Sequence, residues 1–310
     1  MRVLDLLFFC RPLLLIPVWT VFLLLFDATF PEQAFTLSDT LSDILNLVAI
    51  SALTAAGYII NQIYDLKGDR LNNKLGFFDR PVAFRLATGW VMYGAFTVTA
   101  LGYAFLRPEL LAPYSASALA GWIYSAPPLR GKDRPWLGLT LNAVPYSVII
   151  WWALVVDTRG VSVAFSQITS QTALMLSSLA AALAGIYLLT TIPDVAGDRS
   201  AGKRTIAVVY GNNKALVGAI LSLALAFVFG IVAHHPGLYL TAAVALALAL
   251  FALKTGELSH VLLAAKAPIL LLSAFEVYRH PFYGVFLLAL IALTRVYYKR
   301  RFGIVYPQMA

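Results

Sequence analysis

Charged residues are scarce in this chain. Asp, Glu, Lys and Arg make up 12% of its 310 residues, whereas 60% are hydrophobic, and a soluble domain carries roughly 25% charged residues. This composition excludes an ordinary water-soluble fold and indicates an integral, multi-pass membrane protein. Ten apolar stretches approach the roughly 20 residues that a membrane-spanning helix needs, the last three being the least certain: 4–26, 44–63, 86–106, 109–125, 137–156, 171–192, 214–232, 237–253, 258–278 and 281–298. We therefore predict an all-α transmembrane bundle of about nine helices, with ten segments possible.

Cysteine is almost absent as well. The single Cys10 excludes an intrachain disulfide and a zinc site built from several thiolates, and we expect it to be a small buried residue. The first apolar stretch is too long for a cleavable signal peptide and lacks a small-residue cleavage site. We expect it to be the first span of a single integral membrane domain covering residues 1–310.

The formal net charge of +8 does not indicate a nucleic-acid partner, because the basic residues gather in alternate loops. Twelve Lys or Arg lie in three of these loops, 61–85, 130–134 and 194–214, and the loops between them hold only Arg107 and Arg159. By the positive-inside rule, the first set faces the cytoplasm of a cell inner or plasma membrane. The basic run at 299–301 would face the cytoplasm too, which fits ten spans or a re-entrant segment better than nine.

One acidic phrase occurs twice. YIINQIYDLKGDRLNNK at 58–74 and YLLTTIPDVAGDRSAGK at 187–203 share seven of seventeen positions, including both aspartates, a glycine, an arginine and a lysine. Each copy ends an even-numbered predicted span. This pattern predicts an internal repeat that forms two equivalent helix ends on the same side of the membrane.

The aspartates of each copy are four residues apart, so on a helix they lie on one side. Asn61 precedes Asp65 and Asp69 by the same spacing, and Asp194 and Asp198 form the second pair. Carboxylate and amide oxygens suit a hard cation, and Mg²⁺ is usually held by a few carboxylates together with substrate phosphates. A helix C-terminus further favours a cation.

Glycine and basic residues follow each acidic pair. We expect the chain to leave the helix at Gly68 and at Gly197, so that Lys and Arg come next to the carboxylates. A metal–diphosphate site needs carboxylates that bind the metal and Lys or Arg side chains that bind the phosphate, and each copy provides both in this order.

Several alternatives account for these residues less well. Aspartates at a membrane boundary can simply be solvated, but four in two matched sets among fifteen acidic residues favour a site. An EF-hand alternates its ligands every second residue, and a P-loop ends in Gly-Lys-Ser/Thr; neither pattern is present. We expect His234 and His235 to be surface residues, and we assign no acidic or cysteine partner at ligand spacing to His260 or His280.

At these positions the chain resembles the UbiA superfamily of intramembrane prenyltransferases. Asn61, Asp65 and Asp69 fit the first motif of that family, Asn-x-x-x-Asp-x-x-x-Asp, and Asp194 and Asp198 fit the second. YSAPPLRGK at 124–132 is similar to the loop between the motifs, and Arg11-Pro12 also matches. The resemblance extends from about residue 8 to 300.

The resemblance implies helices around a central cavity that opens to the lipid, with magnesium bridging the motifs to an isoprenyl diphosphate. Loss of diphosphate leaves an allylic cation, which a lipophilic and usually aromatic acceptor attacks. The implied metal ligands and catalytic groups are Asn61, Asp65, Asp69, Asp194 and Asp198, and Tyr124 is the expected aromatic residue beside the cation. Six basic residues are expected to contact the diphosphate: Lys132, Lys203, Arg204, Arg80, Arg130 and Lys67. These cations could instead bind membrane lipids.

Two other functions remain open at this point. A carrier with an internal repeat could couple ion movement to substrate passage, although carriers place charged sites near the membrane midplane, whereas both motifs lie at predicted helix ends. An inactive prenyltransferase-like scaffold would have lost motif carboxylates, and none is missing. Residues 82–85 depart from the family's pattern after the first motif, which leaves the acceptor open between aromatic molecules of quinone, tocopherol or chlorophyll synthesis and a carotenoid or glycerol lipid.

Overall fold

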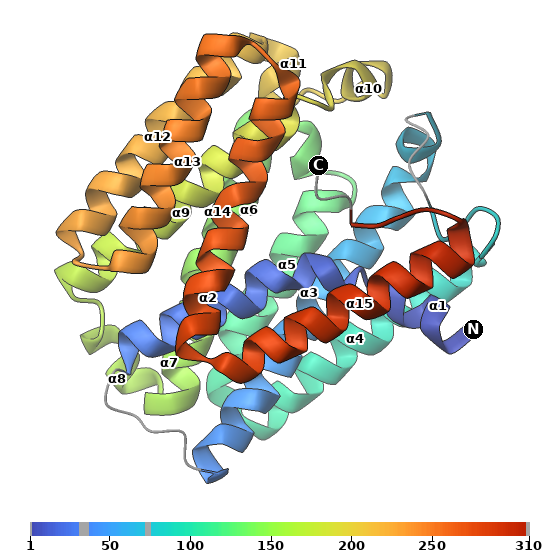
Figure 1. Cartoon of the computed structure of the whole chain (residues 1–310). Coiled ribbons are helices and arrows are strands. Elements are labelled where there is room, and N and C mark those ends of the chain that lie inside the picture. Colours follow the sequence, from blue (N-terminus) through green and yellow to red (C-terminus); the bar gives the residue numbers. More distant parts are fainter. Residues whose placement is uncertain (1, 31–36, 72–75, 308–310) are drawn as a thin grey trace.

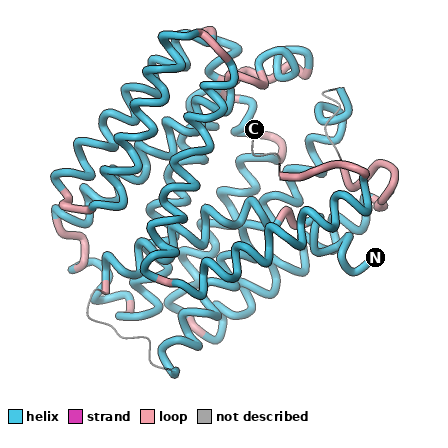
Figure 2. The backbone as a smooth tube through the Cα atoms, in the orientation of Figure 1, coloured by secondary structure: helices cyan, strands magenta, loops and turns pink. Residues whose placement is uncertain are grey.

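The computed structural model describes residues 2–30, 37–71 and 76–307, and every regular element in these ranges is a helix (Figures 1 and 2). The α-helices are α1 (Arg2–Phe9), α2 (Ile16–Thr29), α3 (Leu37–Leu71), α4 (Leu86–Leu106), α5 (Leu111–Ser125), α6 (Pro135–Val144), α7 (Ile150–Arg159), α8 (Val161–Ser166), α9 (Ser170–Thr191), α10 (Val195–Ser200), α11 (Ile206–Tyr210), α12 (Asn212–Val232), α13 (Pro236–Thr255), α14 (Leu258–Arg279) and α15 (Pro281–Phe302). The predicted all-α bundle is confirmed.

Nine helical segments within the described ranges are long and apolar enough to cross a membrane. They coincide with nine of the ten predicted stretches, and one of them is formed by α6 and α7 together, joined by a π-helical turn at Pro145–Ile149. Pro145 has no N–H to donate, so the regular hydrogen-bond ladder is locally rearranged there. The tenth stretch is α5, which is shorter than the others but connects the two ends of the bundle.

The helices form two sets that cross each other (Figure 1). The first set comprises α2 to α5 with α7, and the second comprises α9 and α12 to α14. Small residues allow close packing in the second set, where α13 buries Ala242, Ala245, Ala249 and Ala252 along one face. In the first set, Gly57 of α3 faces Gly121 of α5, where an added Cβ would lie 3.5 Å from the opposite Cα. Such small-residue contacts favour helix association in lipid.

We call the end of the bundle that carries Asp65 the motif end and the other the opposite end. At the motif end, Arg301 of α15 makes two 3.0 Å contacts with the carboxylate of Asp5, and Tyr297 donates to the same group at 2.7 Å. The helices α1 and α15 therefore lie side by side, and the basic run at 299–301 lies at the same end as the motifs. A chain that begins and ends at the same end of the bundle crosses it an even number of times, which agrees with ten crossings when α5 is counted with the nine longer segments.

The two copies of the acidic phrase differ in backbone structure, so the predicted equivalence of the helix ends is wrong. The first copy continues α3 without a break to Leu71, whereas in the second copy α9 ends at Thr191 and a turn leads into the separate helix α10. Pro193 stands where the first copy has Tyr64, and proline interrupts a helix. The expected exits at Gly68 and Gly197 are also wrong, because both helices continue beyond them.

Candidate active site

The first acidic motif lies on the last turns of α3, and the oxygens of Asn61 and Asp65 contact lysines from two loops. Asn61 and Asp65 are one helical turn apart, and Asp65 is buried, with 8% of its surface exposed. Asp69 follows one turn later and is half-buried. An aspartate buried in an apolar bundle is stabilised only by partners of opposite charge or by hydrogen-bond donors.

One such partner is Lys132, from the loop between α5 and α6. Its Nζ lies 2.8 Å from Asp65 Oδ1 and also donates to Asn61 Oδ1, and only 6% of its side chain is exposed. The loop reaches this position through Arg130, which has a left-handed backbone (φ 42°), and through Gly131. A Cβ on Gly131 would lie 2.6 Å from Leu141 Cδ1 and 3.3 Å from the Ile123 carbonyl oxygen, so the loop packs tightly against α5 and α6 at this glycine.

The second motif reaches the same place through Lys203. Its Nζ lies 3.6 Å from Asp65 Oδ1 and 3.4 Å from Asp198 Oδ1, so one ammonium group connects carboxylates that are far apart in sequence. Asp198 is buried and lies on α10. The backbone N–H of Arg204 donates to the carbonyl of Asp133 at 3.1 Å, which holds the two loops together above the site.

The two lysines experience different electrostatic environments. Burial lowers the pKa of Lys132, and the neighbouring Asp65 offsets only part of that effect. Burial also acts to lower the pKa of Lys203, but the carboxylates of Asp65 and Asp198 outweigh it and raise the pKa overall. Lys203 is therefore the more firmly charged cation of the pair.

The other predicted site residues differ in their contacts and exposure. Asp194 precedes α10 and accepts the backbone N–H of Asp198 through its carbonyl at 2.8 Å. Arg130 lies 2.7 Å from Asp133, in a contact too poorly aligned to count as a hydrogen bond. Arg80 and Arg204 are exposed. The side chain of Lys67 lies outside the described part of the structure.

We call the cluster of Asp65, Lys132, Lys203 and Asp198 the charged centre. A cavity of about 320 Å³ adjoins it at Asn61. Asn61 lines its mouth, and the wall along α3 continues through Gly57 and Thr54 to Ile50, about 16 Å of helix at 1.5 Å per residue. The deep end is lined by Ala153 and other apolar residues of α7 and its preceding turn. A ligand could therefore place a polar head at the charged centre and an apolar body in the cavity.

Tyrosine hydroxyls and amides provide the few polar groups of this cavity. Tyr124 lines it and accepts a hydrogen bond from Asn142 Nδ2 at 3.1 Å. The hydroxyls of Tyr58 and Tyr146 lie 2.8 Å apart. The rings place aromatic surface around the space in front of the charged centre, which suits a bound or developing cation.

Arg11 also lines the cavity. From the sequence we noted that Arg11-Pro12 matches the family, but we assigned Arg11 no role in the site. It adopts a left-handed backbone (φ 52°) between α1 and the 3₁₀ turn that begins α2. This break turns a cationic side chain toward the cavity within an otherwise apolar stretch. An ionisable residue in such a stretch is itself a signal of function, and this signal could have identified Arg11.

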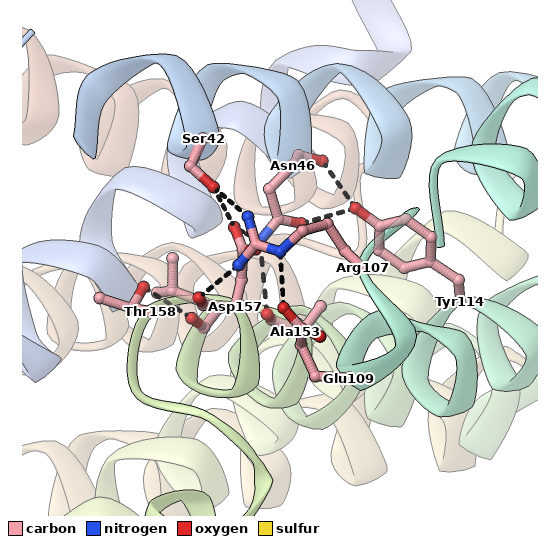
Figure 3. Close-up of polar contacts among 9 residues, drawn as sticks. Ser42, Asn46, Arg107, Glu109, Tyr114, Ala153, Asp157 and Thr158 are labelled. Carbon is pink, nitrogen blue, oxygen red and sulfur yellow. Dashed lines mark hydrogen bonds and ion pairs between the residues drawn. The ribbon is translucent and has the colours of Figure 1, made fainter. Parts of the chain in front are cut away.

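A polar network adjoins the cavity at Tyr114, and Figure 3 shows its contacts. Arg107 donates to Ser42 Oγ at 2.7 Å and to the carbonyl of Asp157 at 2.9 Å, and its Nη2 lies 2.7 Å from Asp157 Oδ1. Asn46 donates to Asp157 Oδ2 at 3.0 Å and accepts from the Tyr114 hydroxyl at 2.8 Å. Tyr114 lines the cavity, so its ring separates the apolar space from this network.

The motif residues fit a metal–diphosphate site in their chemistry, since Asn61 and Asp65 of α3 and Asp198 of α10 offer oxygen atoms that are linked through Lys132 and Lys203. Among the described residues, one group of three has potential ligand atoms within 4.8 Å of one another. This group is Asp27, Glu276 and His280, and it does not include the motif residues. At the motifs, lysine ammonium groups lie between the carboxylates instead.

Fold and site together define an integral, multi-pass membrane protein in which a buried charged centre covers an apolar, aromatic-lined cavity. The sequence profile of the UbiA prenyltransferase family matches residues 14–258, and the chain belongs to that family. This confirms the resemblance found in the motifs.

Chlorophyll synthases are among the curated relatives. The protein of Oryza sativa subsp. japonica is 32% identical over 106 residues, which cover 33% of this chain and 26% of the rice protein. The protein of Avena sativa is 26% identical over 197 residues, which cover 58% of this chain and 49% of the oat protein. The chain thus matches less than half the length of these relatives.

Solved structures share the fold. A UbiA homologue from Archaeoglobus fulgidus bound to DMAPP and Mg²⁺ superimposes with a TM-score of 0.58 at 18% identity, covering 86% of this chain and 96% of that one. Digeranylgeranylglyceryl phosphate synthase gives a TM-score of 0.64 at 16% identity, covering 89% and 98%. An apo UbiA homologue from Aeropyrum pernix K1 gives 0.62 at 19% identity, covering 83% and 94%.

Proposed function

We propose that the protein catalyses Mg²⁺-dependent transfer of an isoprenyl group from a polyprenyl diphosphate to a lipophilic, aromatic acceptor within the membrane. The observation that carries this proposal is the position of Asn61. Its side chain accepts from Lys132 in the charged centre and also lines the apolar cavity. A molecule with a diphosphate head and a hydrocarbon chain matches this continuous polar and apolar space.

The five oxygen-bearing motif residues would hold the metal, which when bound supplies positive charge to the leaving diphosphate. Lys132 and Lys203 would bind the phosphate oxygens and stabilise the charge that develops as the carbon–oxygen bond breaks. The bonding electrons leave with the diphosphate, and the allylic carbon becomes cationic. Tyr124 and its neighbours would shield that carbon from water until the acceptor supplies an electron pair and then loses a proton.

The sidedness follows from the basic loops. All three loops that are rich in Lys and Arg lie at the motif end, and the positive-inside rule assigns this end to the cytoplasm. A water-soluble diphosphate would then leave into the cytoplasm, and the products would stay in the lipid.

The names of the relatives support two acceptor classes. Chlorophyll synthases match this chain in sequence, which supports an aromatic acceptor, whereas the digeranylgeranylglyceryl phosphate synthase shares only the fold. We therefore place the aromatic acceptor first and the glycerol lipid second. The transporter alternative is disfavoured because the motif carboxylates lie at one end of the bundle, whereas carriers place their charged sites near the membrane midplane.

The test is diphosphate release by the purified full-length protein in lipid, with a panel of prenyl diphosphates and membrane-extracted acceptors. We expect release only with Mg²⁺, and losses of at least about 100-fold in Asp65→Ala and Asp194→Ala, the size of effect seen when transition-state charge loses a stabilising group. Glu257→Gln is the matched control, since that carboxylate lies at the motif end but is 63% exposed. Full activity in either aspartate variant would refute the assignment.

The same panel tests whether the cavity holds the hydrocarbon chain. Ala153→Phe would fill the deep end and should reduce turnover of the longer diphosphates by about tenfold or more, the effect of losing about 1.4 kcal/mol of binding, while sparing the shorter ones. Val148→Phe is the control, because Val148 is exposed on the same transmembrane segment. If both variants prefer the same substrate lengths, the hydrocarbon chain of the substrate does not bind at the deep end of this cavity.

A further inference from the structure

A second group of ionisable side chains lies at the opposite end of the bundle. Asp27 comes from the last turn of α2, Glu276 from the last turn of α14, and His280 from the junction between α14 and α15. One potential ligand atom from each lies within 4.8 Å of the other two. His280 Nε2 and Asp27 Oδ2 are 2.8 Å apart.

Glu276 is the most unusual member of this group. It is completely buried, and neither carboxylate oxygen has a hydrogen-bond partner. A buried polar group without partners is costly, and a charged one is more so. The buried Asp157 in the Arg107 network shows how the same fold treats a structural carboxylate, with one oxygen accepting from Asn46 and Ser42 and the other in an ion pair.

None of the described side chains around Glu276 donates a hydrogen bond to it. Ser273, one turn earlier on α14, is bonded to Thr20 at 2.9 Å instead. Arg279 contacts Asp27 at 2.9 Å, and its side chain is 37% exposed, so it can move into solvent. His235 faces the same region with a buried Nδ1 that has no partner.

We propose that Asp27, Glu276 and His280 bind a divalent transition-series cation of the zinc type. One imidazole nitrogen with two carboxylate oxygens is a ligand set that zinc accepts, whereas magnesium and calcium prefer oxygen alone. Three protein ligands leave one coordination position for water or an external group. The cation would compensate the orphaned carboxylate of Glu276, and Arg279 would move away as the metal takes its place beside Asp27.

This site is separate from the charged centre that we assign to the prenyl diphosphate, because it lies at the other end of the bundle and draws on different helices. It corrects the expectation that His280 lacks an acidic partner. Glu276 precedes His280 by four residues, and that spacing was visible in the sequence. His260 likewise has an acidic neighbour, Glu257, at 3.5 Å.

The experiment is a zinc titration of the detergent-purified full-length protein by calorimetry, with Mg²⁺ in excess to saturate the motifs. We expect one zinc ion per chain in the wild type, and affinity at least tenfold weaker in both Glu276→Gln and His280→Ala. His260→Ala is the matched control, since His260 pairs with Glu257 at the motif end, and it should bind zinc as the wild type does.

Three results would overturn the proposal: no zinc bound by the wild type, unchanged affinity in Glu276→Gln and His280→Ala, or loss of binding in Asp65→Ala instead. Thermal unfolding separates metal binding from misfolding. Without zinc, Glu276→Gln should unfold at the same temperature as the wild type or higher, because it removes an uncompensated carboxyl group. With zinc, only the wild type and His260→Ala should be stabilised.

Discussion

The motif end and the opposite end of the bundle both bury ion pairs, but with different cations. At the motif end, the ammonium groups of Lys132 and Lys203 contact Asp65 at 2.8 and 3.6 Å beside an open cavity. At the opposite end, the planar guanidinium of Arg107 is fixed by several acceptors around Asp157. A lysine is a mobile point charge, whereas an arginine fork locks a geometry. The first arrangement is suited to exchanging partners with a substrate, and the second is suited to holding α3, α5 and α7 together.

The largest expected effect comes from breaking the motif end. Lys132→Met keeps the length of the side chain and removes its charge, so the diphosphate loses a buried donor. We expect the rate of prenyl transfer per folded molecule at subsaturating substrate to fall by about 100-fold or more. The unfolding temperature should fall as well, because the buried Asp65 then keeps Lys203 at 3.6 Å and loses the closer cation. Lys254→Met is the control, since Lys254 is exposed at the same end. Comparable rates in the two variants would show that Lys132 only neutralises Asp65.

Breaking the opposite end should affect stability instead of chemistry. Arg107→Ala leaves the buried Asp157 without its cation, and we expect the free energy of unfolding to fall by about 2–3 kcal/mol, less than for a fully buried pair because Arg107 is 31% exposed. The rate per folded molecule should remain similar for short substrates. Arg159→Ala, an exposed arginine beside the Phe30 ring, should cost less than about 1 kcal/mol. Equal losses in both variants would contradict a special role for the network.

The smallest expected effect sharpens the same comparison through pH. Burial acts to raise the pKa of Glu109, but its backbone hydrogen bond and the adjacent Arg107 outweigh burial and lower it. The pair therefore stabilises the fold above the unfolded pKa of about 4.5 and loses that contribution as the pH falls through the lowered folded value. At neutral pH, the wild type should unfold at a slightly higher temperature than Glu109→Gln. The corresponding difference in the free energy of unfolding should be less than about 1 kcal/mol. A difference that persists in acid would have another origin.

The length of the apolar stretches was enough to predict the spanning helices, since lipid requires every backbone group in a span to be paired within its own helix. The motif spacing identified Asp65 and Asp198, and the family resemblance pointed to Lys132 and Lys203. The structure brings these four residues together. Prediction failed where one residue changes the backbone. Pro193 divides the second motif from α9, so two similar sequences have different structures.

Contacts between distant segments were not predictable from one sequence. Asp27 and His280 are 253 positions apart and yet in contact, and nothing in either segment specifies the other. The same holds for Arg107 and Asp157, because an isolated arginine in a loop is normally a surface residue.

The sequence by itself determined that this is a multi-span helical membrane protein with two acidic motifs, because hydrophobic length and charge spacing act locally along each helix. Only the tertiary structure decided that Lys203 joins the two motifs, that Tyr114 links the cavity to the Arg107 network, and that Glu276 is buried beside Asp27 and His280. Those outcomes depend on how the two sets of helices cross, and packing between apolar surfaces leaves no periodic signal in the chain.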